Sequence, residues 1–458
     1  MGPWKLIFLL LLVLATPLTG MSSGVIGGED EADASPKLGA DMNNMPRVDV
    51  DKPVELIPLY LRDKRIHGLQ PFQALVDAAP AGSVLRPKPG NYAGPVHLTK
   101  PLTIEGGGKV SIDGGNKSTV FVIETNDATL RGLHIKGSGS SHDSDDACLN
   151  VRGHHNLIEN LVIDDCLFGI DLKQSNNNTV RGNQIRSKPA DLGVRGDGLR
   201  LWYSMNNRIE NNRVVDSRDM VVWYSNGNAF YRNYGARSRY SIHFMFAHHN
   251  VVESNSFYDN AVGVYMMYSD NTVVRNNVIS HATGATGMGI GFKEASGALI
   301  EGNEIIYCAL GLSADLSPFQ PDSKIILKNN RLAYNGIAIA FNSDLEGYEV
   351  EGNSFEGNIS SLSVGGAGSG QRNNWSGNYW DEYEGFDRNN DGVGDTPYVL
   401  YAYADRLWME IPQARFFKIS PALEVLDFLE RLAPFSNPTL LLADEKPLFN
   451  NPWKRGKK

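Results

Sequence analysis

The sequence predicts an all-β protein, a right-handed parallel β-helix. Three observations carry this prediction: a unit of 21 to 29 residues recurs along the chain, each unit contains short apolar strands, and turns rich in asparagine and glycine separate those strands. A unit this short cannot bury its own apolar face, so it must stack on its neighbours. Stacked parallel strands of this kind form the pectin-lyase-like solenoid, which we expect over residues 51–365.

Nine asparagines mark the repeat. An apolar residue stands three positions before each of them, and eight of the nine have another apolar residue two positions after. Successive coils lie about 4.8 Å apart, so turn asparagines can hydrogen-bond from coil to coil. The aligned residues are Asn160, Asn183, Asn212, Asn233, Asn255, Asn277, Asn303, Asn330 and Asn353.

A second strand in each unit alternates with period 2. The columns thirteen and eleven residues before the aligned asparagine are apolar and must face the interior, so the columns next to them face outward. One outward column holds Asp171, Arg200, Val221, His243, Tyr265 and Gly291. The other holds Lys173, Trp202, Trp223, Met245, Met267 and Lys293. We therefore expect His243 and Met245 to point to solvent, with Met245 and Met267 on adjacent coils.

Trp202, Trp223, Met245 and Met267 form what we call the outward stripe. Exposed apolar surface on a soluble protein usually marks an interaction site. Imidazole and thioether are soft ligands, so His243, Met245 and Met267 are candidate Cu(I) ligands. The same adaptable side chains would equally furnish a docking surface, with Trp202 and Trp223 as anchors, or would only pack. The sequence leaves these alternatives open.

The N-terminal residues predict export across a membrane. An apolar run from Leu6 to Ala15 follows one early lysine and precedes small residues, as in a secretory signal peptide, which we place at 1–24. The run is too short to span a bilayer. Residues 25–50 are acidic and read as a flexible linker, and a short helix over Pro71–Ala79 is expected to cap the coils.

The net charge excludes one class of partner. A net charge of −9 argues against nucleic acid as a partner, because phosphate binding requires a basic surface.

The cysteine content limits the possible disulfides. The three cysteines, Cys148, Cys166 and Cys308, exclude a fold built on disulfides, and at least one must be unpaired or intermolecular. Cys166 and Cys308 lie six repeats apart, too far to bond. A bond between Cys148 and Cys166, about one coil apart, stays open.

The chain after residue 365 is predicted to be a C-terminal extension, 366–458. Its acidic loop contains Asp387, Asn389, Asp391 and Asp395, which match the early ligand spacing of a calcium loop, with Gly392 at the sharp turn. Tyr398 stands where that loop would need its last acidic ligand, so a plain Asn/Asp/Gly turn is the alternative.

An amphipathic helix is expected later in the extension, within SPALEVLDFLERLAP. Phe428 and Leu429 lie on its apolar face and are candidate partner-docking residues. No run outside the signal peptide approaches 18 apolar residues, so the processed protein is expected to be soluble or held at the membrane by partners.

A cluster of His142, Asp143, Asp145 and Asp146 supports a rival function. Paired carboxylates can perform acid and base catalysis, as a secreted polysaccharide lyase or epimerase would require. We expect solvated loop acids instead, because no lysine or arginine accompanies them in a basic cleft for uronates.

Segments that the repeat does not explain point to a family. GATGMGIGFKEA, ADLSPFQP and LDFLERLAPFS, together with NYWDEYEGFDRNNDGVGDTPY, resemble the NosD family of nitrous oxide reductase maturation proteins. The resemblance covers nearly the whole chain after the signal peptide. It implies a periplasmic accessory protein, not an enzyme, that sits on an ABC transporter of permease and ATPase. It also implies a part in assembling the copper-sulfide centre, with a copper-chaperone lipoprotein and the reductase as partners and copper transfer as one route.

Overall fold

The computed structural model describes residues 66–365, 368–402 and 438–454, and a few positions between the last two ranges: 420, 421, 425, 428, 429 and 432. The predicted signal peptide, the acidic linker and most of the predicted tail helix lie outside the described residues. Among the described residues, no helix has the length and apolar character needed to cross a bilayer.

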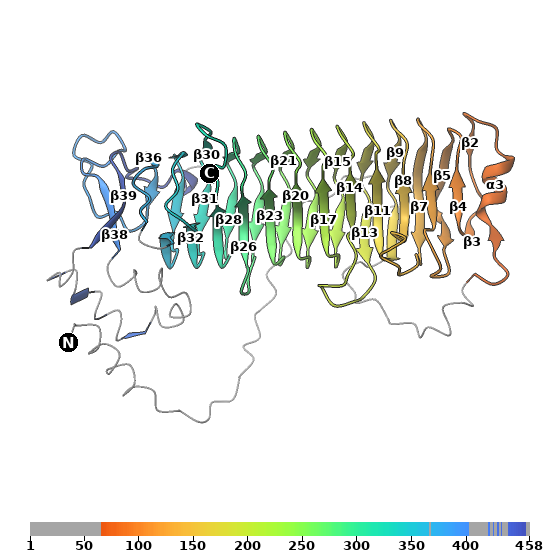
Figure 1. Cartoon of the computed structure of the whole chain (residues 1–458), viewed down its shortest axis with the longest axis horizontal. Coiled ribbons are helices and arrows are strands. Elements are labelled where there is room, and N and C mark those ends of the chain that lie inside the picture. Colours follow the sequence, from red (N-terminus) through yellow and green to blue (C-terminus); the bar gives the residue numbers. More distant parts are fainter. Residues whose placement is uncertain are drawn as a thin grey trace, which may run out of the picture. The chain divides into compact units, whose positions relative to one another are not determined.

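The described strands form a parallel β-helix, as predicted, in which one strand of each coil pairs with its counterpart in the next (Figure 1). The first long sheet has twelve strands: β4 (Val96–Leu98), β6 (Phe121–Ile123), β8 (Ala147–Val151), β11 (Phe168–Lys173), β14 (Leu199–Trp202), β17 (Asp219–Trp223), β20 (Tyr240–Met245), β23 (Val262–Met267), β26 (Met288–Lys293), β29 (Leu310–Asp315), β32 (Ile337–Phe341) and β35 (Ser360–Val364).

The second long sheet has 25 short strands and supplies the remaining walls of the coils. They are β1 (Gln70–Pro71), β2 (Val84–Leu85), β3 (Gly90–Ala93), β5 (Thr103–Asp113), β7 (Thr129–Lys136), β9 (Leu157–Glu159), β10 (Val162–Cys166), β12 (Thr179–Arg181), β13 (Gln184–Ser187), β15 (Arg208–Glu210), β16 (Arg213–Val215), β18 (Ala229–Tyr231), β19 (Tyr234–Ala236), β21 (Val251–Glu253), β22 (Ser256–Tyr258), β24 (Val273–Arg275), β25 (Val278–Ser280), β27 (Leu299–Glu301), β28 (Glu304–Ile306), β30 (Ile325–Lys328), β31 (Arg331–Ala333), β33 (Tyr348–Glu351), β34 (Ser354–Glu356), β36 (Asn374–Ser376) and β37 (Tyr379–Trp380).

The helix expected before the coils is α3 (Phe72–Ala78). Its apolar residues Phe72 and Val76 are buried in the same core as the first strands. The inward columns are buried as the period-2 pattern requires: Ile242 and Phe244 on β20, for example, are fully inaccessible. Each such side chain removes apolar area from water, which stabilises the fold by about 25 cal/mol per Å².

The repeat asparagines form a buried ladder. In each step the Oδ1 atom of one asparagine accepts a hydrogen bond from the backbone N–H of its counterpart in the preceding coil, as Asn255 does from Asn233 at 2.8 Å. The prediction is wrong for Asn160, which is one residue out of register. Its place in the ladder is taken by Leu161, whose N–H donates to Asn183 Oδ1 at 2.9 Å. Asn160 instead occupies a left-handed corner, which asparagine tolerates well.

The coils continue past residue 365, because β36 and β37 pair with β33 and β34. An antiparallel pair, β38 (Tyr398–Ala402) and β39 (Thr439–Asp444), and a short 3-10 helix, η3 (Pro452–Lys454), follow. Asp444 ends the ladder: its Oδ2 accepts from the backbone N–H of Asn378 at 2.9 Å and from Trp380 Nε1 at 3.2 Å. The first part of the predicted extension therefore completes the core.

The cysteines divide into a bonded pair and a free thiol. Cys148 and Cys166 form a disulfide, with Cα atoms 5.5 Å apart, which settles the alternative left open by the sequence. Cys308 is free and buried, and its burial raises the pKa of the thiol to about 12. Cys308 is therefore protonated and inert at neutral pH.

Candidate functional site

The outward stripe is assembled by four neighbouring strands of the twelve-stranded sheet, β14, β17, β20 and β23 (Figure 1). Trp202 pairs in register with Trp223, Trp223 with Met245, and Met245 with Met267. The two tryptophan rings lie 5.5 Å apart. All four side chains are partly exposed, so the structure brings these predicted residues together on one face.

His243 faces outward from β20 but is not exposed, contrary to the expectation that it points to solvent. Only 8% of its surface is accessible. Aromatic rings cover it: Tyr240 stacks on the imidazole at 4.7 Å, and the rings of Trp223 and Tyr265 lie 6.2 and 6.0 Å away. The outward column was assigned correctly, but the large side chains around His243 close over it.

Burial sets the charge state of His243. It lowers the pKa of the imidazole to about 4, more than the Asp219 carboxylate raises it, and Arg239 and Arg218 lower it further. The ring is therefore neutral at physiological pH, which is the form that binds metals. Neither ring nitrogen has a hydrogen-bond partner among the described residues, and the same holds for Trp223 Nε1. Buried polar atoms are seldom left unpaired, so this cluster requires an explanation.

Sequence reasoning missed an aromatic ladder at the edge of the stripe. Tyr203, Tyr224, Phe246 and Tyr268 stack in parallel from coil to coil, with ring centroids 4.9, 5.2 and 4.8 Å apart. All four adopt left-handed φ angles of 49° to 52°. They form the column nine residues before the aligned asparagine, so extending the columns by one position would have found them. We call these four residues the aromatic ladder.

The other histidines of this region, His248 and His249, belong to the turn that follows β20. His248 Nδ1 accepts a hydrogen bond from the backbone N–H of Asp270 at 3.1 Å, and His249 is an exposed residue with a φ of 57°. Within the described parts of the chain, no three His, Cys, Asp or Glu side chains are grouped to hold a metal ion. The predicted copper ligands are not such a group, since they are one imidazole and two thioethers.

The predicted calcium loop uses its side chains on its own backbone. Asp387 accepts from the N–H groups of Asp391 and Gly392 at 3.1 and 3.0 Å, and Asp391 accepts from Val393 at 2.8 Å. Asp395 accepts from the N–H of Arg388 at 2.8 Å. Asn389 donates to Asp391 at 2.9 Å. These are the bonds of a plain Asx-rich turn, and calcium binding stays a prediction.

The predicted docking residues of the tail are exposed. Phe428 and Leu429 have helical backbone, and 59% and 44% of their surfaces are accessible. Two other described tail residues, Val425 and Leu432, are also exposed. Their role as docking residues stays a prediction.

The acidic cluster separates into residues with different surroundings. Asp143 is exposed, whereas Asp146 is buried and accepts from Ser141 N and Ser144 Oγ at 2.9 and 2.8 Å. Asp145 forms ion pairs with Lys173 and with Arg200, the latter at 2.9 Å. The expectation that no basic residue accompanies these acids is therefore wrong. Lys173 and Arg200 come from the next two coils, so sequence proximity gave no sign of them.

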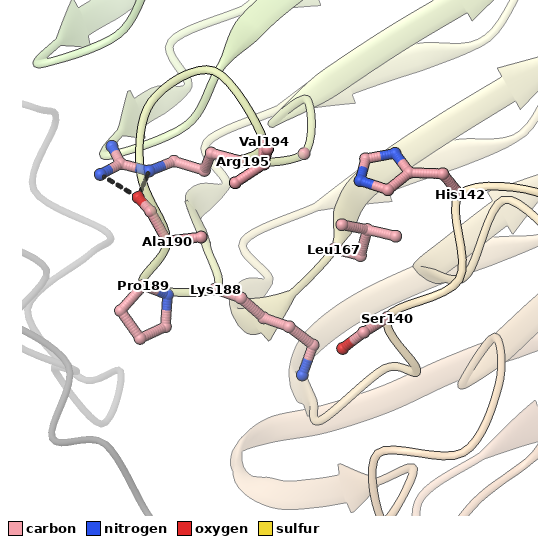
Figure 2. Close-up of a pocket in the computed structure, with 9 residues that line it drawn as sticks. Ser140, His142, Leu167, Lys188, Pro189, Ala190, Val194 and Arg195 are labelled. Atoms are coloured by element: carbon pink, nitrogen blue, oxygen red, sulfur yellow. Dashed lines mark hydrogen bonds between the residues drawn. The ribbon is translucent and has the colours of Figure 1, made fainter.

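Two hollows lie beside this loop. A pocket of about 210 Å³ is lined by Ser140, His142, Leu167 and Lys188 among others, and Figure 2 shows Lys188 extending toward Ser140. The Lys188 ammonium donates to Asn116 Oδ1 at 2.8 Å and to Asp165 at 3.3 Å. The larger hollow is a groove of about 750 Å³, lined by Asp145, Arg152, His154, Lys173, Gln174, Arg200 and Trp202. The groove thus adjoins the outward stripe at Trp202.

A match to a family model agrees with this architecture. Residues 118–234 match the family model "Right handed beta helix region". The mannuronan C-5 epimerase AlgE6 A-module of Azotobacter vinelandii is 16% identical, with a TM-score of 0.49 over 66% of this chain and 93% of that one. The periplasmic alginate epimerase AlgG is 14% identical, with a TM-score of 0.41 over 67% and 87%. The chain is a right-handed parallel β-helix protein whose outward face carries a stripe of aromatic and thioether side chains.

Sequence comparison finds one family that is similar to part of the chain. Residues 187–385 match the model described as "Periplasmic copper-binding protein (NosD)". A "Probable ABC transporter binding protein NosD" of Stutzerimonas stutzeri is 34% identical over 27% of this chain and 30% of its own length. The protein of the same name from Pseudomonas aeruginosa is 25% identical over 75% and 83%. Over these residues the chain is similar to the NosD family, which is described as periplasmic.

Proposed function

We propose that the chain is a non-catalytic copper-handling scaffold that works with an ABC transporter in the maturation of nitrous oxide reductase. The family description names copper, and the relatives are named as ABC transporter binding proteins. The observation that carries the proposal is His243: a buried, neutral imidazole whose two nitrogens lack partners among the described residues, beside two partly exposed thioethers.

His243, Met245 and Met267 are the proposed copper ligands. His243 and Met245 are two residues apart on β20, so their side chains leave the same face of the strand. Met267 on β23 is the direct register partner of Met245. Two thioethers and one neutral imidazole are soft donors that suit Cu(I) rather than Zn²⁺ or Ca²⁺. The aromatic rings around His243 would limit the access of water to the ion.

The surrounding surface is proposed to receive the proteins that bring or accept copper. Trp202, Trp223 and the aromatic ladder give an apolar patch with flat, rigid side chains, which is typical of the central part of an interface. A copper-chaperone lipoprotein or the reductase would dock here, and assembly of the copper-sulfide centre would follow. Phe428 and Leu429 in the tail would pack on the transporter permease.

The proposal also assigns the remaining segments. Residues 1–24 would be removed on export. Residues 25–50 would form a flexible acidic linker before the β-helix, and residues 366–458 would add a docking element after it. Asp387, Asn389, Asp391 and Asp395 would bind calcium only by giving up hydrogen bonds to the loop backbone. We therefore place copper, and not calcium, at the centre of the function.

A Cu(I) competition titration tests the proposal. The triple variant His243→Ala, Met245→Ala, Met267→Ala should bind Cu(I) at least about tenfold more weakly than the unaltered chain. A matched control, His249→Ala with Met205→Ala, removes the same donor types from the turn and should bind as the unaltered chain does. Equal affinity in all three proteins would leave the stripe as a docking surface without a copper site.

A further inference from the structure

The groove next to Trp202 is built differently from the outward stripe. Its walls come from β11, β14 and the turns after β8 and β11, and they carry Arg152, Lys173 and Arg200 against the single carboxylate of Asp145. The three cations are balanced, Lys173 and Arg200 by Asp145 and the buried Asp171, and Arg152 by Glu124 beside it. The hydrogen-bond donors that these pairs leave unused, rather than a net charge, would therefore favour an anionic ligand.

A network of buried charges fixes the floor of the groove. Asp171 is fully buried and accepts both Nε and Nη2 of Arg200, at 2.9 and 3.0 Å, and Asn150 Nδ2 at 2.9 Å. Arg200 also reaches Asp145 at 2.9 Å. Burial raises the pKa of Asp145, but hydrogen bonds and charge from Lys173 and Arg200 outweigh it and lower the pKa overall. Asp145 is therefore an ionised acceptor held in one place.

The rim of the groove keeps hydrogen-bond donors available. Arg152 donates Nε to Asn150 at 2.9 Å and Nη1 to Glu124 at 3.0 Å, while its Nη2 has no acceptor among the described residues. The side chain is 52% exposed. His154 Nδ1 accepts from the backbone N–H of Asn176 at 3.0 Å, so the ring proton is on Nε2. These two groups offer donors that match a carboxylate.

Trp202 gives the groove an apolar wall. Its ring is partly exposed and contacts the rings of Trp223 at 5.5 Å and Tyr203 at 5.7 Å, which continue the aromatic surface along the coils. A simple inorganic anion would make no use of such a wall. A ligand that combines a carboxylate, hydroxyl groups and the apolar face of a ring would satisfy the cations, the Asp145 acceptor and the tryptophan together.

We propose that this groove binds a carboxylate-bearing saccharide of the uronate type. Its carboxylate would lie against Arg152 and His154, its hydroxyls would donate to Asp145 and Gln174, and one ring face would rest on Trp202. The site binds and does not transform the saccharide. The proposal does not depend on the copper ligands, because it involves neither His243 nor the two methionines of the stripe, but it shares Trp202 with the proposed docking surface.

Calorimetric titration of the full processed chain with trigalacturonate tests the proposal. Neutral galactotriose, citrate and a triglutamate peptide serve as comparison ligands of matched size or charge. The Arg152→Ala variant should weaken trigalacturonate binding at least about tenfold, because it removes a charged hydrogen-bond donor. The matched control is Arg275→Ala on the other long sheet, where the arginine is similarly exposed and also pairs with one glutamate. Its affinity for trigalacturonate should not change.

Each outcome of this titration either supports or overturns the proposal. Binding of trigalacturonate that is lost in Arg152→Ala, with little binding of the comparison ligands, supports the proposal. Equal binding of galactotriose overturns carboxylate recognition, and equal binding of citrate or triglutamate overturns the saccharide. No heat at ligand concentrations of about 1 mM overturns the site itself. Cu(I) titration of the same variants separates these results from the copper proposal, since Arg152→Ala leaves the copper ligands in place.

Discussion

The two long sheets of the same coils treat their outward faces in opposite ways. On the 25-stranded sheet, charged side chains pair: Arg275 on β24 donates to Glu253 on β21 at 2.9 Å across coils, and Glu210 on β15 receives Arg208 from its own strand and Arg232 from the next coil. On the twelve-stranded sheet, the same coils present the outward stripe. His243 lies there, buried, and its two ring nitrogens have no hydrogen-bond partner among the described residues. One backbone thus carries a face of ion pairs and, beside the Arg200–Asp171 pair of β14 and β11, a stripe of thioethers with one imidazole that has no partner among the described residues.

This difference marks the twelve-stranded sheet as the face on which a function is expected. Consistent sequences satisfy their polar groups, and the exceptions cluster at functional or strained sites. His243, with both nitrogens unpaired among the described residues, lies on β20 of the twelve-stranded sheet, and the aromatic ladder lies in the turns directly after β14, β17, β20 and β23. Stacked left-handed rings also follow strands of the other sheet, at His281, Tyr307 and Tyr334, so the backbone conformation does not distinguish the two faces. The comparison therefore supports placing the function on β14 to β23, and three measurements of stability would test it.

The largest effect on the free energy of unfolding is expected between substitutions on the inward and outward faces of β20. Phe244→Ala should lower the free energy of unfolding by about 3–5 kcal/mol, because Phe244 is fully buried in the core and packs edge-on against Phe230 at 5.9 Å. Met245→Ala, the next residue on β20, faces outward and should cost less than about 1 kcal/mol. Urea denaturation of both variants measures this. A similar loss in Met245→Ala would mean that the stripe belongs to the stabilising core.

An intermediate effect is expected from a largely buried ion pair of the other sheet. Glu356 on β34 accepts Nε and Nη2 of Arg331 at 2.9 and 3.2 Å, and its surface is 6% exposed. Burial raises the pKa of Glu356, but the Arg331 hydrogen bonds and charge outweigh it and lower the pKa. Because the folded-state pKa is depressed, the stabilisation is present above the unfolded pKa and is lost as pH falls through the folded value.

The test is Glu356→Gln, which should cost about 1–3 kcal/mol at pH 7 and flatten the fall in stability below about pH 4.5. Stability is measured by denaturation between pH 3 and 7, with Glu351→Gln as the control, since Glu351 lies on the same sheet but is largely exposed. If the unaltered chain and Glu356→Gln lose stability in parallel below pH 4.5, the pair does not contribute in the way the geometry suggests.

The features that recur in every coil were predictable from the sequence. Period-2 columns fix which face a side chain leaves, so the core and the pairing of Met245 with Met267 follow from local spacing. The cover over His243 was not predictable, because it depends on how Tyr240 and Tyr265 pack across coils. The off-register Asn160 misled the alignment because corners and ladder positions both favour asparagine.

Contacts between distant residues account for the other misses. The groove joins Asp145 to Lys173 and Arg200, residues that lie one and two coils away. Asp444 ends the asparagine ladder 66 residues after Asn378, in a segment without the repeat. Each contact joins positions whose sequence separation is set by loop length, and loop length varies from coil to coil, so no fixed spacing predicted it.

The smallest effect should come from the exposed ion pairs. Glu253→Gln removes the partner of Arg275, whose side chain is 43% exposed, and should cost less than about 1 kcal/mol, falling further at high salt because solvent screens such pairs. Denaturation at low and high ionic strength measures the change. A larger, salt-independent loss would show that the ion-pair face holds the coils together, and the contrast between the two sheets would then be one of stability and no guide to the site.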